Sequence, residues 1–196
     1  DSEFAFVGLL KECARKNHKQ KNDVVEGCRL HAEILRRKGL LEKSPYLASA
    51  LINMYAKWGM LSKAQEVHDT LPAHDLVSCN TLIAGYAHHG HGYEALNCYE
   101  NMYKEGISPN AITFTCILKA CGNIRDSHKA KQLHCDVMRR GLLKENAVIG
   151  NALVDMYAKC GMLSKAHEVL DELPIRNTVS WSSIIGGYAE QWRKFE

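Results

Sequence analysis

An all-α fold, in the form of an α-solenoid of stacked antiparallel helix–turn–helix units, is predicted by three observations. The first is an internal repeat: residues 45–75 and 147–177 share 17 identities in 31 positions, and the copies lie 102 residues apart. The second is a succession of apolar stripes with helical spacing, separated by glycine or proline. The third is the small size of each predicted unit, because a single helical pair cannot bury its own apolar face and must stack on neighbours. We therefore expect one layer of helices on a concave side and one on a convex side.

The first predicted unit contains helices at residues 4–14 and 24–35, a polar loop at 17–23, and a stop at Gly39. A sixth pair opens at 179–188, and we expect the sequence to end within its second helix. Between these, the predicted helical pairs are 46–57 with 62–70, 77–88 with 93–104, 112–120 with 128–140, and 148–159 with 164–172. No segment is predicted to be a strand, because the short alternation at 77–83 continues into a helical pattern.

Composition is that of a globular protein, with 46% hydrophobic and 24% charged residues in a chain of 196. The net charge of +3 permits an anionic partner without requiring one. No apolar run reaches membrane-spanning length and no targeting segment is visible, so we expect no membrane partner. Because the sequence starts and ends within repeats, we expect it to be a fragment of a longer protein.

The eight cysteines are predicted to be mostly buried, reduced thiols rather than disulfides or metal ligands. The closest pair is Cys116 and Cys121, which lacks the C-x-x-C spacing of zinc and redox sites. His88, His89 and His91 cluster beside glycines, but nothing nearby completes a tetrahedral metal site, so they are interpreted as interhelical surface. Four cysteines fall inside apolar helical patterns: Cys13, Cys79, Cys98 and Cys135.

Motifs across the chain resemble the pentatricopeptide repeat family, specifically its plant subclass of cycling long, short and standard motifs. Residues 150–161 read GNALVDMYAKCG, and 179–181 read VSW. Residues 80–86 read NTLIAGY ahead of GISPN at 106–110, and 113–121 read TFTCILKAC ahead of KQLH at 131–134. The resemblance implies one right-handed α-solenoid over residues 1–196. Its expected repeats are 3–44 (long and degenerate), 45–75 (short), 76–110 (standard), 111–146 (long), 147–177 (short) and 178–196 (partial).

The resemblance also implies single-stranded RNA as partner, with about one base read per helical repeat. The family's base-reading positions are the fifth and the last residue of each motif. Carried onto this sequence, they pair Ser49 with Asp75, Asn80 with Asn110, Thr115 with Asn146 and Asn151 with Asn177, and leave Ser182 without a partner. All are short hydrogen-bonding residues, and those at the last positions also suit helix capping, so both roles stay open.

The second position of each motif is the place where the family's aliphatic side chains sandwich bases, and packing between repeats is the alternative. These residues are Tyr46, Val77, Ile112, Val148 and Val179. Lys57 and Lys159 occupy equivalent places near the ends of first helices, where they could contact phosphate or simply remain solvated. The first unit carries Val7 at its fifth position, so no direct base reading is expected there.

The family's code implies guanine for Ser with Asp, a pyrimidine for Asn with Asn and adenine for Thr with Asn. Repeats two to five would then read guanine, pyrimidine, adenine and pyrimidine in the 5′ to 3′ direction. The resemblance further implies the recognition part of a C-to-U RNA-editing factor in the mitochondrion or chloroplast, acting with editing accessory proteins.

Two other function classes were compared with RNA binding. A solenoid can hold a peptide or partner helix in its groove, and this protein-interaction scaffold remains the alternative. Nothing in the sequence resembles a nucleophile with a paired base, a phosphate-cradling loop or a zinc deaminase signature. We therefore predict no catalytic activity for this segment, no cofactor, no metal and no small-molecule substrate.

Overall fold

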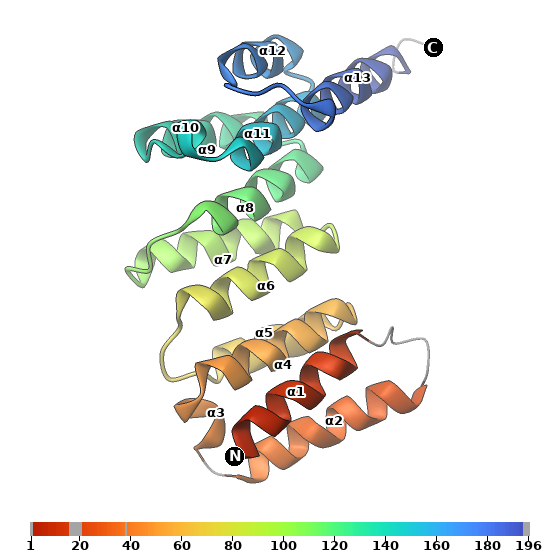
Figure 1. Ribbon diagram of the computed structural model, residues 1–196, viewed down its shortest axis with the longest axis vertical. Coiled ribbons are helices and arrows are strands. Elements are labelled where there is room, and N and C mark those ends of the chain that lie inside the picture. The colour runs from red at the N-terminus through yellow and green to blue at the C-terminus, as the bar shows by residue number, and fades with distance from the viewer. Residues whose placement is uncertain (1, 16–20, 38, 194–196) are drawn as a thin grey trace.

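Paired helices stacked along one axis make up the computed structural model, which describes residues 2–15, 21–37 and 39–193 (Figure 1). The first helices of successive units are α1 (Ser2–Arg15), α4 (Pro45–Lys57), α6 (Leu76–His88), α8 (Ala111–Ile124), α11 (Ala147–Lys159) and α13 (Thr178–Trp192). The second helices are α2 (Lys21–Arg36), α5 (Leu61–Asp69), α7 (Gly92–Lys104), α9 (Ser127–Arg139) and α12 (Leu163–Glu172). The described residues contain no strand, and the predicted all-α solenoid is confirmed.

Two short helices were not predicted. They are α3 (Leu40–Lys43) and α10 (Leu142–Glu145), and each precedes one copy of the internal repeat. Both begin directly after a glycine in the left-handed region, Gly39 with φ 77° and Gly141 with φ 67°. Because a residue without Cβ adopts this conformation at little cost, the chain ends one helix and starts another helical turn at once.

Three predicted boundaries are wrong. Helix α2 begins at Lys21, so the predicted loop at 17–23 is helical from residue 21 onward, while residues 16–20 lie outside the described ranges. Helix α8 continues to Ile124, past the predicted end at residue 120. Helix α13 continues to Trp192, so the sixth unit shows one helix, without a second, as far as the described residues extend. The extension of α8 is packed, because Cys121 and Gly122 are buried and Gly122 lies against α11. The added residues of α13 end at the exposed Trp192.

The repeated stretch forms the scaffold at each unit boundary. Leu153, Met156 and Tyr157 are fully buried in α11, as are their counterparts 102 residues earlier in α4. Each tyrosine hydroxyl also reaches the preceding second helix: that of Tyr55 lies 2.8 Å from Nδ1 of His31, and that of Tyr157 lies 2.9 Å from Nδ1 of His134. These contacts give the repeated stretch a packing role at the boundary between units.

Successive first helices approach closely through small residues. Gly85 lies against Ala56, and Gly187 lies against Ala158, so a Cβ built on either glycine would come within 2.7 Å or 2.9 Å of the alanine Cβ. Between α8 and α11 the glycine is on the earlier helix of the pair: Gly122 of α8 faces the backbone of Met156 on α11. A small residue on one helix therefore sets how near the next helix can lie.

Adjacent glycines in α13 allow a test of this packing. We expect Gly187→Ala to lower the free energy of unfolding by about 1–3 kcal/mol, because its new methyl group would overlap Ala158 and Leu163. Gly186→Ala is the matched control: its Cβ would meet nothing within 4 Å, and we expect a gain of roughly 0.5–1 kcal/mol from helix propensity. Urea denaturation followed by circular dichroism measures both, and equal effects would contradict the close-packing explanation.

The cysteines follow the prediction only in part. All those described are free, and Cys13, Cys79 and Cys121 are buried. Cys135, however, is exposed on α9, so its predicted burial is wrong. Its neighbours Leu133 and Val137 supply the buried face of that helix, which turns residue 135 outward.

Candidate nucleic-acid interface

Large apolar side chains are exposed at the same place in every unit from α4 onward. They are the second residues of the first helices: Tyr46, Val77, Ile112, Val148 and Val179. Their exposed fractions range from 54% to 75%, so only a minority of each side chain is available for packing between repeats. A regularly spaced row of exposed apolar groups on a repeat protein indicates a binding surface.

The predicted fifth-position residues lie one helical turn further along, on the same face as this row. Ser49, Asn80, Thr115 and Asn151 are partly buried, and Ser182 is exposed. The hydroxyl groups of Thr115 and Ser182 donate to the carbonyl oxygens of Ala111 and Thr178, four residues earlier. By contrast, Oγ of Ser49 and Oδ1 of Asn151 have no hydrogen-bond partner among the described residues, although both atoms are shielded from solvent. Such unpartnered polar atoms are uncommon inside proteins and are candidates for ligand contact.

The predicted last-position residues all cap helices. Oδ1 of Asp75 accepts from the amide of Ser78 at 2.7 Å, and Oδ1 of Asn110 accepts from the amide of Thr113 at 3.1 Å. Oδ1 of Asn146 and Oδ1 of Asn177 each accept from the amide two residues later, at 2.9 Å and 3.0 Å. The capping role left open by the sequence is therefore present in all four. Capping also fixes these side chains at the start of the first helices, beside the apolar row.

One predicted base-reading pair is joined directly. Nδ2 of Asn80 on α6 donates to Oδ1 of Asn110 at the start of α8, over 3.2 Å. For the other three predicted pairs, no hydrogen bond joins the fifth residue to the last one in the described part of the chain. The structure thus places all the predicted residues on the first-helix layer, and it holds one pair in a fixed mutual arrangement.

An open groove of about 680 Å³ runs over α4, α6 and α8. Its lining combines two residues of the apolar row, Val77 and Ile112, with the polar side chains of Asn80, Asn110 and Thr115. Burial raises the pKa of the Cys116 thiol in the same lining, so this group is uncharged at neutral pH. The groove therefore offers apolar walls with amide and hydroxyl groups between them.

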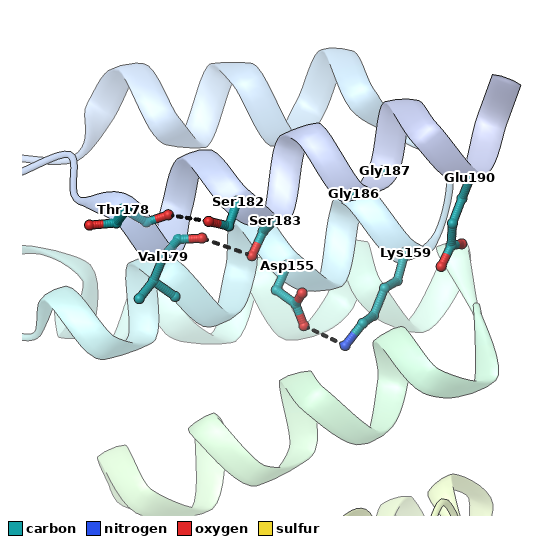
Figure 2. A pocket seen from close by; sticks show the side chains of 9 residues that line it. All are labelled: Asp155, Lys159, Thr178, Val179, Ser182, Ser183, Gly186, Gly187 and Glu190. Carbon is teal, nitrogen blue, oxygen red and sulfur yellow. Dashed lines mark hydrogen bonds and ion pairs between the residues drawn. The ribbon is translucent and has the colours of Figure 1, made fainter.

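A second hollow of about 400 Å³ lies between α11 and α13 (Figure 2). Val179 and Ser182 line it together with Lys159, whose Nζ lies 2.7 Å from Oδ2 of Asp155. The ion pair offsets the charge of Lys159. Lys57, at the equivalent place on α4, is exposed and has no carboxylate four residues earlier, where Asn53 stands. The two predicted phosphate contacts are therefore electrostatically different.

Several groove residues were missed at the sequence level. Lys119 and His88 line the 680 Å³ groove, one and two helical turns beyond the predicted readers, and His89 lines it from the end of α6. His89 also places Nε2 2.7 Å from the carbonyl oxygen of Ala56, which ties it to the preceding unit. The interpretation of these histidines as interhelical surface is thus incomplete. Extending the i, i+4 spacing from Thr115 to Lys119 would have found the first of them.

Within the described ranges, no group of three or more His, Cys, Asp or Glu residues is arranged to hold a metal ion. None of the helices described has both the length and the apolar character needed to cross a bilayer.

Stacked helical pairs with an apolar row beside polar side chains define a helical-repeat protein. The model of the PPR repeat family matches residues 74–123, and the PPR repeat model matches 47–75, 112–142 and 151–177, together well over half of the chain. The chain belongs to the pentatricopeptide repeat family.

Its relatives include two pentatricopeptide repeat-containing proteins of Arabidopsis thaliana. A mitochondrial one is 37% identical over 189 residues, which cover 96% of this chain and 29% of the relative. A chloroplastic one is 39% identical over 186 residues, which cover 95% of this chain and 29% of the relative. The chain thus spans less than a third of the length of these relatives.

Solved structures with the same fold include the pentatricopeptide repeat protein PPR10 from maize. It superimposes with a TM-score of 0.64 at 24% identity, covering 93% of this chain and 26% of that chain. PPR10 in complex with an 18-nucleotide psaJ RNA element gives a TM-score of 0.64 at 20% identity, over 84% of this chain and 25% of that chain. At these identities the likeness concerns the fold.

Proposed function

We propose that this chain binds single-stranded RNA along the first-helix layer, with about one base per unit. The observation that carries the proposal is the exposed apolar row, which places a hydrophobic side chain beside a hydrogen-bonding one in unit after unit. A base has two apolar faces and a polar edge, so it fits between successive members of the row while its edge meets the fifth and last residues. A related fold, PPR10, is known in complex with RNA, and this supports the same class of ligand here.

The base-reading pairs in this proposal are Ser49 with Asp75, Asn80 with Asn110, Thr115 with Asn146 and Asn151 with Asn177, followed by Ser182. The bound tract is then guanine, pyrimidine, adenine, pyrimidine from 5′ to 3′. Of the two groove lysines, Lys57 is the stronger candidate for a phosphate contact, because Asp155 already pairs with Lys159.

We further propose that the chain is the recognition part of an organellar C-to-U editing factor that works with editing accessory proteins. Support comes from the cycle of long, short and standard motifs in the sequence, and from relatives named as mitochondrial or chloroplastic proteins. The corresponding location is the mitochondrion or the chloroplast.

Fluorescence anisotropy with labelled ten-nucleotide RNAs tests the binding proposal. One RNA carries 5′-GUAU-3′ in a neutral context, and the matched control carries 5′-CAUA-3′ in the same context, which replaces the proposed base by its complement at all four positions. We expect the first to bind at least about tenfold more tightly, since each read base contributes a kcal/mol or more of discrimination. Equal affinity for the two RNAs would rule out base reading, and no affinity for either would favour the protein-interaction scaffold.

A further inference from the structure

Thr113, the third residue of α8, is a fully buried polar residue at the boundary between two units. Its Oγ1 lies 2.6 Å from Oδ1 of Asn80 in the preceding unit, 3.1 Å from Oδ1 of Asn110, and 3.1 Å from the backbone nitrogen of Asn110. The hydroxyl therefore contacts both members of one base-reading pair.

The hydrogen bonds around Thr113 fix the direction of the Asn80 amide. Oδ1 of Asn110 must be an acceptor, because it takes the backbone N–H of Thr113 as the cap of α8. The Asn80 atom facing it must then be Nδ2, the donor, at 3.2 Å. This leaves Oδ1 of Asn80 facing Thr113, whose hydroxyl accepts from the Asn110 backbone and donates its own hydrogen across 2.6 Å. A flipped amide would bring two acceptor oxygens together.

We propose that Thr113 is a positioning residue that sets the base specificity of the preceding unit, by holding the Asn80 amide so that it offers only N–H to the groove. The second hydrogen on Nδ2 is the donor that remains, and it suits a carbonyl oxygen on the base edge. Both pyrimidines carry such a carbonyl at O2, whereas the Watson–Crick edge of adenine has no carbonyl and accepts only at the ring nitrogen N1. The inference rests on the proposed RNA binding and adds the physical origin of the pyrimidine preference in the 76–110 unit.

The same chain contains natural comparisons. Ser78 and Ser180 stand at the same helix position, but their hydroxyls return to the residue that caps their own helix, Asp75 at 3.0 Å and Asn177 at 2.8 Å. Asn151 belongs to the other predicted Asn–Asn pair, with Asn177, and its Oδ1 has no hydrogen-bond partner among the described residues. The amide oxygen of one asparagine reader is therefore held by a hydrogen bond, and that of the other is not. We expect the nucleotide at Asn80 to be discriminated more strongly than the nucleotide at Asn151.

The test measures dissociation constants of the whole chain for RNAs that carry uracil or adenine opposite Asn80. We expect the unchanged chain to bind the uracil RNA about tenfold more tightly than the adenine RNA. In Thr113→Val this ratio should fall to about threefold or less, since losing one net hydrogen bond changes a dissociation constant by a factor of this order. Thr113→Ser keeps the hydroxyl and should restore discrimination. Ser78→Ala is the matched control, because it removes a similar capping box without touching a fifth-position side chain, and discrimination opposite Asn80 should stay unchanged.

Full discrimination in a folded Thr113→Val variant would overturn the inference. If that variant does not fold, equal uracil-to-adenine discrimination at Asn80 and Asn151 in the unchanged chain would overturn it equally. Failure of the unchanged chain to bind the predicted tract contradicts the proposed function instead, so the two failures are distinguishable.

Discussion

Exchanging Asn80→Ser together with Asn110→Asp should change the base preferred by the 76–110 unit from a pyrimidine to guanine. The exchange reproduces the pair that the preceding unit already carries, Ser49 with Asp75. A carboxylate only accepts hydrogen bonds, and the Watson–Crick edge of guanine presents two neighbouring donors, N1–H and the N2 amino group. We expect the ratio of dissociation constants for guanine and uracil at this nucleotide to shift by about tenfold to hundredfold.

Anisotropy titrations with RNAs that differ only in this nucleotide measure the shift. Aspartate also caps helices well, so α8 should keep its start and circular dichroism should change little. The matched control applies the same exchange to Asn151 and Asn177, which should move the guanine preference to the nucleotide two places further along. A shift at the same nucleotide in both variants would contradict one-base-per-unit reading.

Placing a carboxylate in the apolar row should remove most RNA binding. We expect Val77→Asp or Ile112→Asp to raise the dissociation constant at least about hundredfold, because each change removes a wall of the base-binding space and sets a negative charge near phosphate. Both side chains are more than half exposed, so stability should fall by less than roughly 0.5–1 kcal/mol.

Val25→Asp is the control for this prediction. Val25 is 60% exposed, like the groove residues, but it lies on α2 in the second-helix layer. The same change of charge and shape there should leave the dissociation constant within about twofold. Comparable losses in all three variants would mean that net charge, and not the groove, controls binding.

Most of the architecture could be predicted from the repeated sequence. Glycines such as Gly59 and Gly161 adopt φ values of 72° and 74° between paired helices, as expected for helix stops that need the left-handed region. Polar residues at the predicted starts, including Asp75 and Asn177, cap the helices that follow them. These features are local, so the sequence specifies them within a few residues.

The errors have different causes. Cys135 faces solvent because Leu133 and Val137, one helical turn apart, occupy the packed side of α9, and this spacing is visible in the sequence. Residues 189–192 continue α13 with Trp192 exposed, so packing does not account for them. Residues 121–124 were not predicted as helix, although Cys121 and Gly122 of α8 are buried, with Gly122 against α11. Local periodicity contains no information about such neighbours.

For the candidate site, the sequence by itself determined the spacing of the polar and apolar side chains, because a repeat of helical pairs returns each motif position to the same face. It could not determine how those side chains engage one another. That Thr113 holds Asn80 against Asn110, that Asn151 is left without a partner at Oδ1, and that Asp155 offsets Lys159 all depend on the tertiary structure. The physical reason is that hydrogen bonds and ion pairs depend on differences of a few tenths of an ångström between side chains, which only the packing of α6, α8, α11 and α13 sets.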